Sequence, residues 1–282
     1  MSSTPALVLG ANGHLGKIVA ADLAARNVPL VLFGHSSLPA SSDGVKAVQG
    51  SLVADDPGLA EALKDVATVV HCVSNPLRTQ EIDVGGTQAL VDTIKKLYPS
   101  AESQPRIIYI SIVGIEEHSD YFYYKAKVDA ERIIISSGVP HTILRTAQWH
   151  PFIKVIADQF LGLKDPSADC YTVPTGVDLR PVSIEEVGGK VVELVLSGKA
   201  EGCLPDMVGP EFLSLEQAVT IYLKSRQSHA QLKLYDPVSP DYPDSMFRAF
   251  NGNARDPIDP KFFILGKQTW EEFLNDPNSR FW

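Results

Sequence analysis

The chain has only three cysteines, no dense block of basic residues and no apolar run long enough to cross a membrane. Cys72, Cys170 and Cys203 are far apart and show neither a CxxC pair nor metal-ligand spacing, so no disulfide framework or metal site is expected. The formal net charge is −9, which argues against a basic nucleic-acid-binding face. No basic stretch precedes an apolar one at the N-terminus, so we expect a cytoplasmic protein without a signal peptide or a membrane partner.

A glycine pattern stands at the start of the chain, between a strand and a helix. Ala6–Leu9 is an apolar run typical of a buried parallel strand, and Leu15–Arg26 has the pattern of an amphipathic helix. Gly10, Gly13 and Gly16 lie between or at the edge of these elements, where glycine permits a tight turn, close approach of a diphosphate and close helix packing. We therefore predict a dinucleotide site at the helix N-terminus; the alternative is an ordinary strand–turn–helix glycine turn.

Strand and helix patterns alternate through the first half of the chain. The expected strands are Ala6–Leu9, Pro29–Phe33, Val45–Val48, Ala67–Val73, Arg106–Val113 and His141–Leu144, and the expected helices are Leu15–Arg26, Asp55–Lys64, Val84–Leu97 and Tyr121–Ser137. This alternation predicts an α/β fold with a Rossmann-type, doubly wound parallel sheet.

The second half is less regular: residues 146–182 contain several aromatic residues, and we predict that they are rich in loops. Later elements are expected at Ser183–Leu196, with a capping box of Ser183 and Glu186, and at Ser214–Ser225, Gln231–Tyr235 and Thr269–Leu274, with proline-punctuated loops at Asp236–Pro243 and Asp256–Pro260. We predict a Rossmann domain at residues 1–149, against which the helix at 183–197 packs, and a smaller C-terminal substrate lobe at residues 150–282.

The end of the second expected strand bears on the choice of nicotinamide cofactor. A carboxylate there usually holds the ribose hydroxyls of NAD, but His35, Ser36 and Ser37 follow the strand instead. These side chains can accept a 2′-phosphate, which a carboxylate would repel, so the sequence favours NADP over NAD. The alternative is a solvated loop without a role in binding.

The helix expected after the fifth strand contains two overlapping Tyr/Lys pairs, Tyr121/Lys125 and Tyr123/Lys127. Residues four apart share one face of a helix, and an ammonium group beside a phenol makes the phenol a better proton donor. Ser111, at the end of the strand, could polarise the same acceptor oxygen. The alternative is a surface helix with exposed lysines.

We choose Tyr123 and Lys127 as the catalytic pair. Glu131 follows Lys127 by one helical turn, and with this phase Val128 and Ile135 are expected to face the sheet. Beyond the sixth strand, Trp149, His150 and Phe152 are candidate substrate residues, at the carboxyl edge where open α/β sheets bind ligands. His150 could transfer a proton, or it could be a structural histidine beside a core tryptophan.

Several stretches together resemble the atypical short-chain dehydrogenase/reductases, and within them the NmrA-like NAD(P)H-binding group. They are the glycine turn Gly10-x-x-Gly13-x-x-Gly16, Tyr109–Ile115, Tyr123–Glu131, Thr142–Arg145, Pro181–Val187 and Gln268–Leu274. The resemblance implies a Rossmann domain with a C-terminal substrate lobe. The cofactor contacts that it implies are Gly10, Asn12, Gly13, His14, Leu15 and Gly16, then Ser51 and Leu52 for adenine, Val73 and Ser74, and Lys127 for the nicotinamide ribose.

The chain also departs from the family pattern. Relatives often carry two serines at the end of the fifth strand, whereas Ser111 is followed by Ile112, and Ser51 stands where an adenine-contacting aspartate is common. The favoured function is an NADPH-dependent oxidoreductase that reduces a small apolar carbonyl or conjugated substrate as a monomer or homodimer. The alternatives are a non-catalytic NADP-sensing regulator that binds a protein partner, and a redox-neutral isomerase or cyclase.

Overall fold

The protein is described here by a computed structural model of residues 4–36, 38, 41–118, 120–160, 169–236 and 262–279. The chain folds into two compact units that alternate along the sequence. The first unit comprises Met1–Ser111, Lys125–Leu144 and Val187–Leu204, and the second comprises Ile112–Tyr124, Arg145–Glu186 and Pro205–Trp282. The assignment of residues 1–149 and 150–282 to a cofactor domain and a substrate lobe stays a prediction.

The first unit contains a parallel sheet. Its strands are β1 (Ala6–Leu9), β2 (Leu30–Gly34), β3 (Val45–Gln49), β4 (Thr68–His71), β5 (Arg106–Ile112), β6 (His141–Thr146) and the short β9 (Gly202–Cys203), with the last residues of β5 and β6 continuing into the second unit. They lie in the order β6-β5-β4-β1-β2-β3, and β9 pairs with β6. Val8 of β1 pairs with Leu32 on one side and Val70 on the other. This order confirms the predicted doubly wound sheet.

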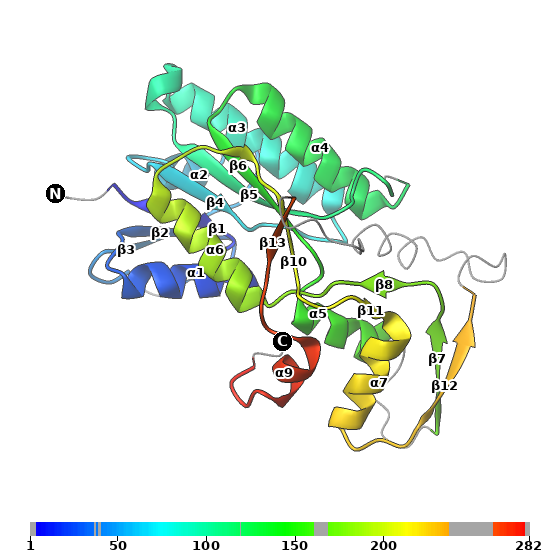
Figure 1. The fold of residues 1–282 in the computed structure, drawn as a ribbon. Coiled ribbons are helices and arrows are strands. Elements are labelled where there is room, and N and C mark those ends of the chain that lie inside the picture. Colours follow the sequence, from blue (N-terminus) through cyan, green and yellow to red (C-terminus); the bar gives the residue numbers. More distant parts are fainter. Residues whose placement is uncertain are drawn as a thin grey trace. The chain divides into compact units, whose positions relative to one another are not determined.

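Helices cover both faces of this sheet, with α3 and α4 on one side and α1 and α6 on the other (Figure 1). The helices are α1 (His14–Ala25), α2 (Pro57–Ala62), η1 (Gln80–Gly85), α3 (Gly86–Leu97), η2 (Ala101–Ser103), α4 (Phe122–Ser137) and α6 (Ile184–Ser197). Strands β1 and β4 are buried along their whole length, which explains the apolar sequence of β1 and the two central valines of β4.

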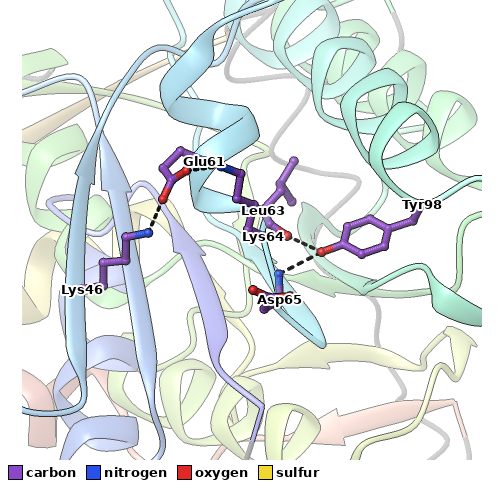
Figure 2. A network of polar contacts seen from close by, with 6 residues as sticks. All are labelled: Lys46, Glu61, Leu63, Lys64, Asp65 and Tyr98. Atoms are coloured by element: carbon purple, nitrogen blue, oxygen red, sulfur yellow. Dashed lines mark hydrogen bonds and ion pairs between the residues drawn. The ribbon is translucent and has the colours of Figure 1, made fainter.

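A tyrosine secures the chain where the short helix α2 ends. The Tyr98 hydroxyl, which follows α3, donates to the Leu63 carbonyl at 2.7 Å and accepts from the Asp65 amide at 3.0 Å. Figure 2 shows this clamp beside the exposed carboxylate of Glu61, which is paired with two lysines. The clamp satisfies backbone groups that a helix end leaves without intrahelical partners.

The second unit has its own apolar core. Its elements are α5 (His150–Val155), η3 (Ile156–Phe160), β7 (Cys170–Pro174), β8 (Asp178–Leu179), β10 (Asp206–Val208), β11 (Leu213–Ser214), α7 (Leu215–Ser225), β12 (Gln231–Tyr235), β13 (Phe263–Leu265) and α9 (Trp270–Asn275). β7 pairs with β12 and β10 with β13, both in parallel. Trp270 and Phe273 of α9 stack at 5.6 Å between ring centroids in the core, where Tyr222 of α7 is also buried.

Some predictions from the sequence were wrong or incomplete. Residues 146–182 contain α5, β7 and β8 in addition to loops. The sequence did not reveal these elements, because they are short; the proline at the start of α5 suits the first turn of a helix. Val128 is buried as predicted, but Ile135 is 47% exposed and does not face the sheet. The Ser183 hydroxyl accepts from the Glu186 amide, as the predicted capping box requires. The Glu186 carboxylate, however, accepts from the Lys267 amide at 2.8 Å. Residues 237–243 and 256–260 lie outside the described part.

Both units bury a histidine. His71 of β4 is 1% exposed, and burial together with the nearby Lys127 ammonium lowers the pKa of its imidazole to about 3. His150 has no exposed surface, and burial lowers its pKa to about 4, partly offset by the Pro181 backbone and the Gln268 side chain. Both side chains are therefore neutral near pH 7.

We expect acid to destabilise the fold through His150. The unfolded chain takes up a proton on this imidazole near pH 6.5, whereas the folded state does so only near pH 4. Stability is therefore full above pH 6.5 and decreases as the pH falls towards 4, by about 2 kcal/mol between pH 7 and pH 5. Urea denaturation at both pH values will measure this loss. In a His150→Leu variant, the free energy of unfolding should decrease by about 2 kcal/mol less between pH 7 and pH 5, because the effect of His71 is the same in both proteins. If the variant loses as much stability as the wild-type protein, His150 is not the cause of the acid sensitivity.

Candidate functional site

The glycine turn after β1 is tight enough to require its glycines. Gly10 adopts a φ of +77°, and a Cβ atom at this position would lie 3.2 Å from the Cys72 backbone. The Gly13 amide donates to the Gly10 carbonyl at 2.8 Å. A Cβ at Gly16 would lie 2.2 Å from that same carbonyl oxygen, which no side chain can do. The first turn of α1 therefore packs directly on the end of β1.

The N-terminus of α1 has the features of an anion site. Gly13 is its N-cap residue, no side chain caps it, and no acidic residue lies in its first turn. Gly13 and His14 are exposed, whereas Leu15 is buried and anchors the helix. The strand order reverses between β1 and β4, so this N-terminus stands at the switch point, where such sheets bind ligands. Backbone amides of the first helical turn and the positive end of the helix dipole fit a dinucleotide diphosphate there.

The loop after β2 presents polar side chains to solvent. His35 and Ser36 are exposed, and Asn12 Nδ2 donates to Ser36 Oγ at 3.1 Å. Gln49 Nε2 donates to the His35 carbonyl at 3.2 Å, which ties the loop to β3. Ser37 lies outside the described residues. The described residues that directly follow β2 therefore bring no carboxylate to the position beside the glycine turn.

The expected adenine contacts differ in exposure. Ser51 is exposed, and its amide donates to Asp56 Oδ2 at 3.1 Å, while Asp56 Oδ1 caps α2 by accepting from the Leu59 amide at 2.9 Å. Leu52 is 6% exposed and packs so closely on Gly86 that a Cβ there would lie 2.9 Å from it. The backbone at these two positions is thus fixed by a carboxylate and by core packing.

A polar network around a buried carboxylate follows β4. Val73 is half-buried, and Ser74 Oγ donates to Asp83 Oδ1 at 2.6 Å. Lys127 Nζ lies 3.8 Å from the same carboxylate oxygen and donates to the Ile110 carbonyl at 3.0 Å. The Lys127 ammonium also lies 4.5 Å from the centre of the Tyr109 ring. The first unit thus connects two expected cofactor residues, Ser74 and Lys127, through a residue that sequence reasoning missed.

The two Tyr/Lys pairs differ in their lysines. The Lys125 side chain is 59% exposed and pairs with Asp129 on the surface at 2.7 Å, whereas the Lys127 side chain is 5% exposed. Tyr123 is half-buried, and its ring packs at 6.4 Å from that of Tyr121. The geometry thus favours Lys127 over Lys125 as the lysine with an interior role.

Ser111, the third expected catalytic residue, is buried. It is 2% exposed, and its hydroxyl has no hydrogen-bond partner among the described residues. It lies two residues after Tyr109 in β5, and so on the same face of the strand. Because the Oγ atom is inaccessible in this conformation, any contact with a substrate requires the surrounding side chains to move.

The expected substrate residues belong to the second unit. Trp149 and Phe152 are half-buried, and Trp149 Nε1 donates to Thr146 Oγ1 at 3.0 Å. The His150 ring packs 5.1 Å from Phe273 and 5.9 Å from Trp270. Neither of its nitrogens makes a hydrogen bond of good geometry within the described residues. This apolar packing favours a structural role for His150.

Sequence reasoning missed two buried polar residues. Asp83 is completely buried, and Gln148, which directly follows Ala147 after β6, is 6% exposed with both amide atoms lacking a partner among the described residues. Asp83 lies in the π-helical turn η1, and π turns often mark functional positions. Nothing in the sequence around Gln148 distinguishes it from a surface residue.

Comparisons with known proteins agree with this geometry. An NAD(P)H-binding family model matches residues 10–150, half of the chain. Phenylcoumaran benzylic ether reductase PT1 of Pinus taeda is 24% identical over 279 residues, which cover 93% of this chain and 88% of that protein. No helix among the described residues is both long and apolar enough to span a membrane.

Solved structures share the fold at low sequence identity. A nucleoside-diphosphate-sugar epimerase from Staphylococcus aureus has a TM-score of 0.72 at 16% identity and covers 96% of this chain and 100% of its own. An isoflavone reductase has a TM-score of 0.71 at 17% identity, and the match covers 97% of this chain and 99% of that protein. The solved structures share the fold, and the match of the family model over half of the chain shows that this protein belongs to the NAD(P)H-binding family.

Proposed function

We propose that this protein is an NADPH-dependent reductase of a small apolar carbonyl or conjugated substrate. The observation that carries the proposal is the uncapped N-terminus of α1 at the switch point, in a chain whose buried Lys127 follows Tyr123 by one helical turn. The relatives named phenylcoumaran benzylic ether reductase and isoflavone reductase support a reductase. The apolar character of the substrate is inferred from Trp149 and Phe152, which are half-buried aromatic side chains.

In this mechanism, the glycine turn and the backbone amides of the first turn of α1 would hold the diphosphate, and Lys127 would bind the nicotinamide ribose. The nicotinamide supplies a hydride when it is bound. The Tyr123 hydroxyl holds the proton that passes to the substrate oxygen as this oxygen becomes negative, and the Lys127 ammonium stabilises the phenolate that remains. Ser111 donates a hydrogen bond to the same oxygen after the side chains around it move.

The proposed preference for NADPH depends on the loop after β2. His35 and Ser36 are exposed and polar, and Asn12 orients the Ser36 hydroxyl. Hydroxyl and imidazole groups can donate hydrogen bonds to a 2′-phosphate, whereas a carboxylate would repel it. No NADP-specific arginine accompanies them in this loop, so the discrimination is expected to be moderate.

One observation favours a second candidate function. The Ser111 hydroxyl is inaccessible, and the next residue is Ile112 rather than a second serine. A protein that binds NADPH but cannot polarise a substrate oxygen would serve as a sensor of the cofactor for a protein partner. NADPH oxidation, followed by absorbance with a panel of aldehydes, ketones and enones, separates the two functions: tight binding without turnover on any of them would favour the sensor.

A Gly13→Asp substitution tests the anion site. The backbone at Gly13 is extended, which suits an aspartate N-cap, so the carboxylate should bond the first helix amides and occupy the diphosphate position. We expect NADPH affinity to fall by about 100-fold or more, while thermal stability is kept or increased. Calorimetric titration and thermal denaturation measure the two quantities.

Gly13→Ala is the matched control, since it adds the same Cβ, 3.2 Å from the Gly10 carbonyl, without a charge. It should weaken binding much less than the aspartate does. Equal affinities of the aspartate variant and the wild-type protein for NADPH would remove the glycine turn from the proposed site, and with it the proposed function.

A Ser36→Asp substitution tests the preference for NADPH. The new carboxylate should repel the 2′-phosphate and accept hydrogen bonds from the ribose hydroxyls of NADH. We expect the NADPH dissociation constant to rise by about 10-fold while that of NADH stays level or falls. The same substitution at exposed Ser100 is the control for added charge. A parallel loss for both cofactors would argue against 2′-phosphate recognition at this loop.

A Tyr123→Phe substitution tests the proton donor. Removing the hydroxyl leaves the ring to pack against Tyr121 and Tyr124, so we expect the fold and NADPH binding to persist while turnover falls by about 100-fold or more. Tyr121→Phe is the matched control and should keep most of the activity. If the Tyr121 variant loses turnover and the Tyr123 variant does not, the donor belongs to the other pair.

A further inference from the structure

Asp83 is a fully buried carboxylate with three partners in the first unit. Its Oδ1 accepts from Ser74 Oγ at 2.6 Å and lies 3.8 Å from Lys127 Nζ, and its Oδ2 accepts from the Asn75 amide at 3.1 Å. Its carbonyl accepts from the Thr87 hydroxyl at 2.5 Å. The carboxylate thus connects the loop after β4 to helix α4, and both its backbone and its side chain are held.

Lys127 depends on this carboxylate for charge balance. Its side chain is 5% exposed, and Asp83 is the acidic residue within 4 Å of its ammonium among the described residues. An isolated buried cation is costly, and a carboxylate at ion-pair distance offsets much of that cost. Glu131 is also buried on α4, one turn further along, but lies beyond ion-pair distance of Nζ.

The other titratable groups around Lys127 do not supply a negative charge near pH 7. Burial and Lys127 keep His71 neutral, with a pKa of about 3. Burial raises the pKa of the Tyr109 phenol, as do the Asp83 and Glu131 carboxylates. Burial also raises the pKa of the Cys72 thiol to about 12, against the opposing effect of Lys127. The ammonium is therefore balanced mainly by Asp83.

The distance of 3.8 Å between Lys127 and Asp83 has a chemical consequence. It is short enough for an ion pair but too long for a hydrogen bond. The Ile110 carbonyl accepts one ammonium hydrogen at 3.0 Å, so two of the three donors of Lys127 are not used by the described residues. The carboxylate thus neutralises the ammonium while leaving donors available to a bound molecule.

We propose that Asp83 is a positioning residue, which holds the Lys127 ammonium and the Ser74–Asn75 loop in the arrangement that receives the nicotinamide ribose. The inference rests on the proposed function, because it takes Lys127 as the ribose ligand. Asp83 itself touches neither cofactor nor substrate in this scheme. Its effect on cofactor affinity passes through Lys127 and through the two hydrogen bonds that it accepts from the loop.

The test is a double-mutant cycle in the full-length protein, with NADPH affinity and thermal midpoint as readouts. Asp83→Asn keeps the size of the side chain and removes its charge. We expect it to weaken NADPH binding by about 10-fold and to lower the thermal midpoint by roughly 5 to 10 °C, since the ammonium loses its counter-charge. Asp92→Asn on α3 is the matched control: Asp92 is exposed, accepts from Gln88 at 2.9 Å, and should behave like the wild-type protein.

Lys127→Met supplies the second arm of the cycle. If Asp83 acts through Lys127, Asp83→Asn should reduce NADPH affinity little further in the Lys127→Met background, and the double variant should melt closer to wild type than Asp83→Asn alone. Should Asp83→Asn fail to fold, the double variant must still fold, because it has no unpaired ammonium. An equally unstable double variant would overturn the pairing.

The outcomes separate this inference from the proposed function. Lys127→Met with unchanged NADPH affinity would remove Lys127 from the ribose site, and the proposed function would lose its lysine whatever Asp83 does. Weakened binding in Lys127→Met, together with wild-type affinity and stability in Asp83→Asn, would overturn the role of Asp83 alone. Equal losses from Asp83→Asn with and without Lys127 would likewise show that it does not act through the lysine.

Discussion

The contact between the Gly10 carbonyl and Gly16 is the constraint from which the candidate site is built. The oxygen occupies the space that a Cβ at Gly16 would need, so helix α1 lies as close to the end of β1 as two backbones allow. This fixes the direction of the helix and brings its uncapped amides to the point where the strand order reverses. A backbone contact of this kind involves no charged side chain, so the positive end of the helix remains available for an anion.

The first unit buries two cations and stabilises them in different ways. The Arg106 guanidinium of β5 donates to the Val195 carbonyl at 2.6 Å and to the Lys199 carbonyl, at the end of α6, so the negative end of a helix faces it. Lys127 instead faces the carboxylate of Asp83 and keeps donors unused. The first arrangement joins a helix to the sheet, whereas the second is suited to a residue that must bind something else.

The sequence predicts those parts of the molecule whose signals are local. The positions of the strands and helices follow from alternating apolar and amphipathic patterns, and the glycine turn and the lysine four residues after Tyr123 can be read within a few positions. The pairing of β7 with β12 joins short strands with a long stretch of chain between them, and no local pattern specifies the partner. The same holds for Asp83, whose importance comes from Lys127 in a distant helix. The burial of Ser111 and His150 depends on tertiary packing that no spacing rule contains.

The chain passes between its two compact units after residues 111, 124, 144, 186 and 204. Neither unit is therefore a continuous piece of polypeptide that a single truncation could isolate. A fragment ending near residue 150 would lack α6 entirely, and with it the Val195 carbonyl that accepts from the buried guanidinium of β5. Ribosomal synthesis must thus pass Ser197 before the sheet can acquire its last helix, so two segments of the second unit are made before the first unit is complete.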